Sequence, residues 1–222
     1  GTVQVGLDWP NGLEGRVEAV DGGFLTFLAD GVGLKPALYA KDGLHWKRND
    51  VSGEHAGHIF GASLGRDGRR LVYRYSTASV PDQWYAASLE REGGKVSIKD
   101  PVRVTDLNPS FKDKTKARTE VVRWKGALGE WVEGLLYYPI GYEEGKRYPL
   151  FTAPHGGPAG ADMDAWDESW AYPHQLICQR GAFILKPNYH GSTNYGLKFV
   201  ESISRARYYD YPIEDIEKGV DH

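Results

Sequence analysis

Short strand-like segments recur in the first half of the chain with a spacing in the forties. Phe24 and Leu71 lie in two such segments and are 47 positions apart, and Tyr39 and Tyr85 lie 46 positions apart in the segments that follow. Turn signals such as Lys41-Asp42-Gly43 separate the strands within each set. A period of this length with several short strands per unit is typical of β-propeller blades.

The repeat predicts propeller blades in residues 1–110, forming only a partial propeller. Two blades cannot close a ring, because a propeller typically contains about four to eight. A small β-sandwich with coincidental strand spacing is the alternative at this stage. Residues 111–118 then predict a solvated linker. Their basic run, Lys112 to Arg118, is too short and too interrupted by Asp113 to indicate a nucleic-acid patch.

Strand-like and helix-like segments alternate from residue 119 to residue 222. Helices are predicted at 164–180, at 197–204 and from 213 onward, and strands at 119–124, 131–139, 182–189 and from 148 to the turn at 154–158. The first two strands are joined at 126–129 as a hairpin. The alternation that follows is typical of a mostly parallel sheet with flanking helices.

The turn that ends the strand starting at Tyr148 has the sequence Pro154-His155-Gly156-Gly157-Pro158. Two glycines at the end of a buried strand allow backbone N–H groups to approach a ligand closely. In α/β-hydrolases a loop of this type supplies one donor of the oxyanion hole, which stabilises the negative charge that develops during acyl transfer. The alternative is a structural Gly-Gly turn capped by the histidine.

Composition excludes several other classes of function. The 222 residues carry a formal net charge of −3, so there is no electrostatic case for nucleic acid or for an anionic membrane. No run of about 18 apolar residues predicts a spanning helix, and residues 1–5 lack the pattern of a signal peptide. The single cysteine, Cys178, lies in an apolar helical pattern and is expected to be a buried structural thiol.

No cofactor or metal is expected. The chain has no Cys/His group with zinc-site spacing, and it contains neither G-x-G-x-x-G nor the P-loop pattern. The protein is expected to be soluble, either cytoplasmic or exported.

Several stretches together resemble the prolyl oligopeptidase family of serine peptidases, in particular its acylaminoacyl and dipeptidyl peptidase branch. The matching stretches are Val132–Pro139, Pro154–Pro158, Gln179–Phe183 and Pro187–Gly196, and Ser79–Tyr85 resembles the last-blade pattern. The resemblance implies that residues 119–222 are the N-terminal part of an α/β-hydrolase catalytic domain that follows the propeller. It also implies that the backbone of Gly157, or alternatively Gly156, donates to the oxyanion.

The same resemblance makes His155 and His190 candidates for the substrate pocket. His155 stands where some branches have a tyrosine whose hydroxyl contributes to the oxyanion hole. His190 replaces an arginine that is common in the family's loop. Loop packing or a polar contact is the alternative reading for His190.

No G-x-S-x-G nucleophile elbow occurs in the chain. Ser192, in Gly191–Gly196, has the wrong spacing, and the catalytic serine, aspartate and histidine are expected C-terminal to residue 222. Asp221 and His222 are interpreted as surface residues. The chain is therefore interpreted as a segment of a longer peptidase and is expected to be inactive alone.

The leading functional hypothesis is a parent serine peptidase that hydrolyses short peptides through an acyl-enzyme. Its expected partners are peptide substrates and the missing C-terminal half of the catalytic domain, with a homo-oligomer possible; nucleic acid and membranes are not expected. Two alternatives are a carboxylesterase of the α/β-hydrolase type and a non-catalytic propeller that binds a partner.

Overall fold

The computed structural model describes residues 8–157, 159–204 and 207–222. These residues form two compact units. The first contains the described residues up to Ser76 together with Asp82–Leu107, and the second contains Thr77–Pro81 and the described part of Asn108–His222. Pro158 of the glycine-rich motif and residues 1–5, on which the signal-peptide prediction rests, lie outside the described residues.

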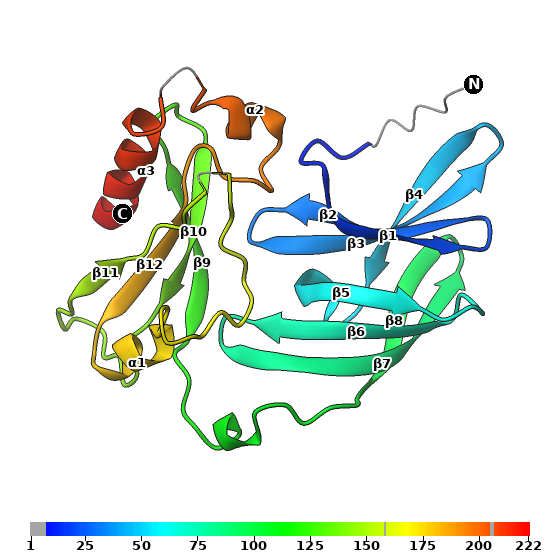
Figure 1. Cartoon of the computed structure of the whole chain (residues 1–222), viewed down its shortest axis with the longest axis horizontal. Helices are drawn as coiled ribbons and strands as arrows, with labels where there is room; N and C mark the ends of the chain where they lie inside the picture. The colour runs from blue at the N-terminus through cyan, green and yellow to red at the C-terminus, as the bar shows by residue number, and fades with distance from the viewer. Residues whose placement is uncertain (1–7, 158, 205–206) are drawn as a thin grey trace. The chain divides into compact units, whose positions relative to one another are not determined.

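Eight strands of the first unit form two consecutive antiparallel meanders (Figure 1). The first consists of β1 (Leu13–Val20), β2 (Gly23–Asp30), β3 (Gly33–Asp42) and β4 (His45–Ser52). A 3₁₀ turn at Ala56–His58 leads to the second, which consists of β5 (Ile59–Leu64), β6 (Arg70–Thr77), β7 (Val80–Glu92) and β8 (Lys95–Arg103). A short parallel pairing joins β4 to β8.

The repeat predicted from the sequence corresponds to equivalent strands of the two meanders. Phe24 and Leu71 lie on the second strand of each set, and Tyr39 and Tyr85 lie on the third. Phe24 stacks on Tyr39 with ring centroids 5.0 Å apart. These rings belong to a core built on Leu28, Ala37 and Tyr39. Phe24 and Tyr39 are directly opposite each other on β2 and β3, so their rings pack together on one face of the first meander.

The second unit contains a four-stranded mixed sheet in the order β11-β12-β10-β9. Its strands are β9 (Thr119–Lys125), β10 (Trp131–Tyr137), β11 (Leu150–Thr152) and β12 (Phe183–Asn188); a 3₁₀ turn at Pro109–Phe111 precedes them. β9, β10 and β12 pair antiparallel, and β11 and β12 pair parallel. The hairpin of β9 and β10 and the parallel pair of β11 and β12 follow the prediction, whereas the pairing of β12 with β10 is antiparallel. A parallel pair needs a crossover connection, and only β11 and β12 are joined by one.

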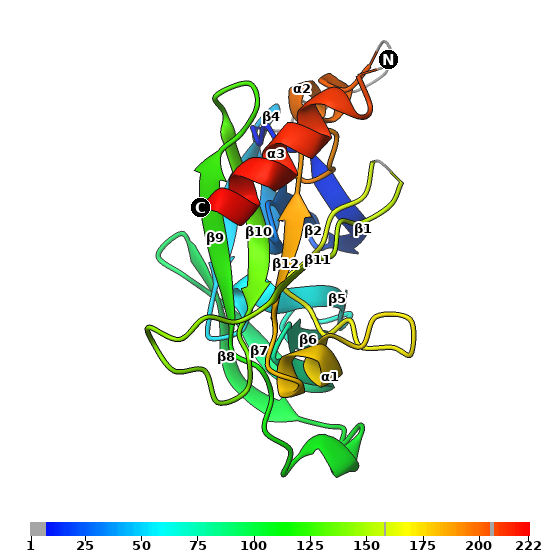
Figure 2. The ribbon, with the colours of Figure 1, turned by 90° about the vertical axis from the view of Figure 1, so that its left-hand side faces the viewer.

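Within the described part of the second unit, three helices accompany this sheet: α1 (His174–Gln179), α2 (Leu197–Glu201) and α3 (Asp210–Asp221). Figure 2 shows α3 lying across the face of β9, β10 and β12. Under α3 lies a core of Trp124, Val132, Leu185 and Phe199. In the described part of the chain, no helix is long and apolar enough to cross a membrane.

The helix predicted at 164–180 is wrong over its first ten residues, because only α1 forms. Pro173 disfavours helical backbone at the residue before it. The acidic side chains upstream are used for other contacts: Asp164 accepts a hydrogen bond from the Ala78 N–H at 2.8 Å, and Glu168 accepts one from the Gln175 N–H at the start of α1.

Candidate functional site

Two loops leave the carboxyl ends of the parallel strands β11 and β12. Residues 153–163 follow β11, and residues 189–196 follow β12. The Ala153 N–H donates to the Leu185 carbonyl at 2.8 Å, which keeps the first loop in line with its neighbouring strand. Ligands of open α/β sheets bind beyond the carboxyl ends of the strands. The candidate site is therefore built from these two loops.

Gly156 and Gly157 are exposed on the first loop. Gly157 has φ of +134°, and a Cβ atom there would lie 3.0 Å from the Ala159 nitrogen. Its conformation therefore requires glycine. A Cβ atom on Gly156 would meet nothing within 4 Å. Among the described residues, neither N–H group has a hydrogen-bond acceptor, so both can donate to a ligand.

The imidazole of His155 contacts residues of both loops through its two ring nitrogens and through one face of the ring. Its Nε2 lies 2.8 Å from the Ser192 Oγ, and its Nδ1 lies 3.0 Å from the Gly156 carbonyl oxygen. The ring stacks on Tyr189 with a centroid separation of 4.6 Å and an interplanar angle of 16°. The Tyr189 hydroxyl donates to the His155 carbonyl oxygen. Burial, and then the charge of Asp162, raise the pKa of Tyr189, so this hydroxyl stays protonated and keeps donating.

The contact between His155 and the Gly156 carbonyl fixes the direction of the next N–H group. The Gly156 C=O and the Gly157 N–H belong to one planar peptide unit, and in a trans peptide they point in opposite directions. Because the carbonyl faces the imidazole, the Gly157 N–H points away from it. His155 thus contacts the loop backbone, and its predicted contact with substrate stays a prediction.

Ser192 meets a histidine but has no access to a substrate. Its side chain is fully buried, and its hydroxyl lies 2.7 Å from the Tyr189 carbonyl oxygen as well as near His155. A nucleophile needs an exposed hydroxyl beside its base. The pair is consequently a structural hydrogen bond, in agreement with the wrong spacing of its motif.

A buried polar network supports the base of both loops. Asn188, at the end of β12, accepts from the Asp162 N–H at 2.7 Å and donates to the Asp162 carbonyl at 2.9 Å. Lys186, 3% exposed, forms ion pairs with Asp162 at 2.9 Å and Asp167 at 3.0 Å. Sequence reasoning missed these residues. The signal was a lysine and an asparagine inside an otherwise apolar strand.

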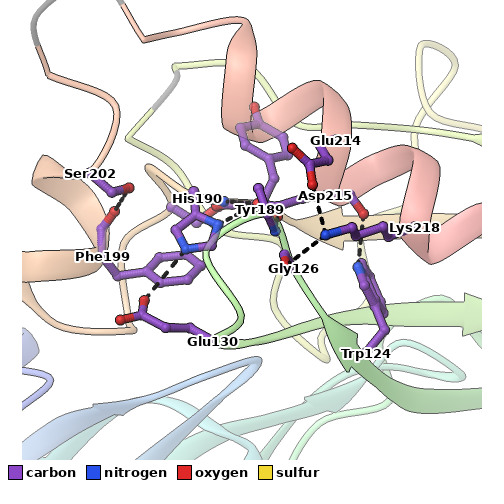
Figure 3. Close-up of polar contacts among 12 residues, drawn as sticks. Trp124, Gly126, Glu130, Tyr189, His190, Phe199, Ser202, Glu214, Asp215 and Lys218 are labelled. Atoms are coloured by element: carbon purple, nitrogen blue, oxygen red, sulfur yellow. Dashed lines mark hydrogen bonds and ion pairs between the residues drawn. The ribbon is translucent and has the colours of Figure 1, made fainter.

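His190 lies in a second polar cluster, between the loop after β12 and α3 (Figure 3). The residue is fully buried, its Nδ1 is 2.6 Å from an oxygen of the equally buried Asp215, and its Nε2 is 3.4 Å from Glu130. Its ring stacks on Phe199 at 4.5 Å. All of these contacts are within the fold, and a contact of His190 with substrate stays a prediction.

Two opposing effects act on the pKa of His190. Burial lowers it, but the hydrogen bonds and charges of Asp215 and then Glu130 outweigh burial, and the net shift is upward. Asp215 also accepts from the Ala127 N–H at 2.7 Å, and its carbonyl accepts from the Trp124 indole at 2.8 Å. The cluster therefore fastens α3 to the turn between β9 and β10.

Asp221 and His222 are exposed at the end of α3, as predicted. Cys178 is fully buried on α1, as predicted. Within the described ranges, no group of three or more His, Cys, Asp or Glu side chains could hold a metal ion.

No family profile matches the chain. The dipeptidyl-peptidase 4 of Giardia intestinalis is 37% identical over 89 residues, which are 39% of this chain and 11% of that protein. A probable dipeptidyl-peptidase 5 of Emericella nidulans is 27% identical over 171 residues, 76% of this chain and 22% of that protein.

Among solved structures, an acylaminoacyl peptidase from Pyrococcus horikoshii superposes with a TM-score of 0.70 at 22% identity. The match covers 93% of this chain and 30% of that one. The chain thus spans less than a third of each of these three proteins.

The relatives in sequence are named as peptidases, and the strand-rich first unit matches the propeller-like part of the solved structure. The chain is thus similar to dipeptidyl peptidases in sequence, which supports the resemblance to the prolyl oligopeptidase family of peptidases, and each match covers only a fragment of the relative. The resemblance seen in the sequence is confirmed.

Proposed function

We propose that this chain is part of a serine-type peptidase and supplies the oxyanion-hole loop of its catalytic domain. The observation that carries the proposal is the exposed Gly156–Gly157 pair directly after parallel strand β11, whose N–H groups meet no acceptor among the described residues. Gly157 would donate to the oxyanion, with Gly156 as the alternative. A fixed backbone donor aimed at the developing charge lowers the barrier of acyl transfer.

In this proposal residues 1–110 are part of a β-propeller, 111–118 are a linker, and 119–222 are the N-terminal part of an α/β-hydrolase domain. The crossover from β11 through α1 to β12 supports the hydrolase assignment. The nucleophile, acid and base would lie C-terminal to residue 222. The substrates would be short peptides, in keeping with the peptidase names of the sequence relatives. The segment alone would be inactive.

The first experiment labels the natural polypeptide that contains residues 1–222 with a fluorophosphonate and measures its intact mass before and after. One adduct is expected on that polypeptide, and none on the isolated segment. Hydrolysis of dipeptidyl and acyl-aminoacyl arylamides is then compared with hydrolysis of simple esters. If the polypeptide hydrolysed esters but neither type of arylamide, the peptidase proposal would be wrong and a carboxylesterase would be indicated. If it formed no adduct and hydrolysed no substrate, a non-catalytic binding function would be indicated.

The second experiment tests the loop itself with Gly157→Ala in the same polypeptide. The substitution strains φ of +134° and is expected to lower kcat by roughly 10²- to 10³-fold, the usual effect of losing one oxyanion donor. The matched control is Gly181→Ala, which strains φ of +84° in open space beyond α1. Full activity of Gly157→Ala would overturn the assignment of the donor.

A further inference from the structure

The hydroxyl of Tyr195 lies between the side chains of two opposite residues of the sheet. Glu133 on β10 and Asn188 on β12 are directly opposite each other in the antiparallel pair. The Tyr195 hydroxyl is 3.0 Å from the Glu133 Oε1 and 2.9 Å from the Asn188 Nδ2. We propose that Tyr195 is a positioning residue: through the Asn188 amide it holds the loop after β11, and thereby the Gly157 N–H, in place. The inference rests on the proposed function, in which Gly157 donates to the oxyanion.

The direction of each hydrogen bond follows from the groups involved. A carboxylate oxygen can only accept, so the Tyr195 hydroxyl donates its one hydrogen to Glu133 and accepts from the Asn188 amide. Burial, and then the charge of Glu133, raise the pKa of Tyr195, which keeps this hydrogen on the oxygen. Glu133 is itself only 6% exposed and is paired with Arg123 at 2.8 Å. The hydroxyl is therefore held from both sides.

The amide of Asn188 connects this hydroxyl to the backbone of Asp162. One hydrogen of its Nδ2 goes to the Tyr195 oxygen, and the other goes to the Asp162 carbonyl at 2.9 Å. Its Oδ1 accepts from the Asp162 N–H at 2.7 Å. Both backbone groups of one loop residue are thus paired with one fully buried side chain. The three contacts together hold the Asn188 amide in one orientation.

A closely packed turn connects Asp162 with the glycine pair. At Gly160 a Cβ atom would lie 2.9 Å from the Gly156 carbonyl oxygen, so the backbone of the turn leaves little space between these two residues. The Gly156 carbonyl belongs to the planar peptide unit that carries the Gly157 N–H. A shift at Asp162 is therefore passed on to this donor, because the turn has no space in which to absorb it.

The kinetic test is Tyr195→Phe in the natural polypeptide, a variant that removes the hydroxyl and keeps the ring. We expect kcat to fall roughly tenfold with KM unchanged, because misplacing a transition-state donor by about 1 Å costs up to about 100-fold. The matched control is Tyr138→Phe, which also takes a hydroxyl away from a glutamate, the exposed Glu120 at 2.7 Å. The control should stay within about twofold of the wild type.

A double variant separates positioning of the donor from loss of stability. Once Gly157→Ala has displaced the donor, adding Tyr195→Phe should lower kcat less than about threefold further, as expected for residues that act through one another. A residue that only stabilises the fold would cost the same in both backgrounds. Equal losses would therefore overturn the inference.

Hydrogen exchange followed by mass spectrometry does not depend on turnover. In Tyr195→Phe we expect residues 153–163 to exchange about fivefold faster, the effect of losing one hydrogen bond, while β9 and β10 keep their wild-type rates. Unchanged exchange in 153–163, or equally faster exchange throughout the second unit, would overturn the inference even if Gly157→Ala abolished activity. Conversely, full activity of Gly157→Ala would remove the oxyanion assignment, and faster exchange confined to 153–163 would still show that Tyr195 holds this loop.

Discussion

One carboxylate oxygen of Asp215 accepts hydrogen bonds from both the backbone N–H and the ring Nδ1 of His190, at 2.7 and 2.6 Å. The two residues are 25 positions apart, and neither is accessible to solvent. A single side chain on α3 therefore satisfies the backbone of the loop after β12 and fixes its imidazole. Several consequences for stability can be measured.

Asp215→Ala should destabilise the second unit by about 3–5 kcal/mol, because it leaves His190 and the Ala127 N–H buried without their acceptor. Urea unfolding measures the change. Asp210→Ala on the same helix is the control, because its ion pair with Arg207 is exposed and contributes less than about 1 kcal/mol. Equal effects of the two variants would contradict the role of Asp215.

Stability should depend on the protonation of His190. Its pKa is raised in the folded protein, so the charged imidazole stabilises the fold below the unfolded value of about 6.5. This contribution is lost as the pH rises through the raised pKa. The carboxylates that face the ring are Asp215 and Glu130, and Lys198 pairs with Glu130 at 2.7 Å.

The measurement compares unfolding free energies of the wild type and His190→Asn between pH 6 and pH 9. Asparagine can still donate to Asp215 but does not titrate, so the advantage of the wild type should shrink with rising pH. If the stability advantage of the wild type over His190→Asn stayed constant or grew with rising pH, the raised pKa of His190 would be contradicted.

Gly219→Ala should destabilise α3, although alanine normally favours a helix interior by about 1 kcal/mol over glycine. A Cβ atom there would lie 2.7 Å from Cζ2 of Trp124, whose indole is held by the Asp215 carbonyl. Overpacking of this kind costs about 1–3 kcal/mol. Thermal unfolding measures the change, with the exposed Glu217→Ala as control; a stabilised Gly219→Ala would mean that the indole moves aside.

Gly160→Ala and Gly156→Ala should differ in activity although both add one methyl group to the same loop. At Gly160 the Cβ atom would lie 2.9 Å from the Gly156 carbonyl oxygen and 3.2 Å from the His155 Nδ1, whereas at Gly156 it meets open space. In the natural polypeptide we expect kcat to fall about tenfold or more for Gly160→Ala, because the donor peptide is displaced. Gly156→Ala should keep most of the activity, and the reverse order would refute this geometry.

Cys178 should resist alkylation in the native protein. The thiol is fully buried, and burial, followed by the charge of Glu168, raises its pKa to about 12, so almost no thiolate is present at pH 8. Iodoacetamide should label it only after unfolding in urea, as followed by mass. Rapid labelling without denaturant would show that α1 opens locally.

Local patterns in the sequence predicted most of the strands. β2, β3 and β6 lie where alternating apolar residues and turn signals predicted them, and the hairpin of β9 and β10 follows the glycines at 126 and 129. The strands β1 and β5 were missed. Apolar and polar residues do not alternate regularly in either segment, so the pattern that indicates a half-buried strand is weak there.

The contacts of the site could not be predicted in the same way. The glycine pair was found because its spacing after a strand is a local pattern. The bond between His155 and Ser192 joins residues 37 positions apart, and it exists only because β11 and β12 end at the same edge of the sheet. Likewise, Glu168 is predicted as a helical residue from its neighbours, yet its carboxylate instead accepts from the N–H of Gln175.

The link between the loops after β11 and β12 also limits how related proteins can be recombined. If two related proteins are joined at a breakpoint anywhere between residues 160 and 188, the chimera takes His155 from one parent and Ser192 from the other. Chimeras with breakpoints before 153 or after 196 would inherit the two loops together. A library of such chimeras should therefore lose active members mainly within that internal interval, even where both parents have the same strands.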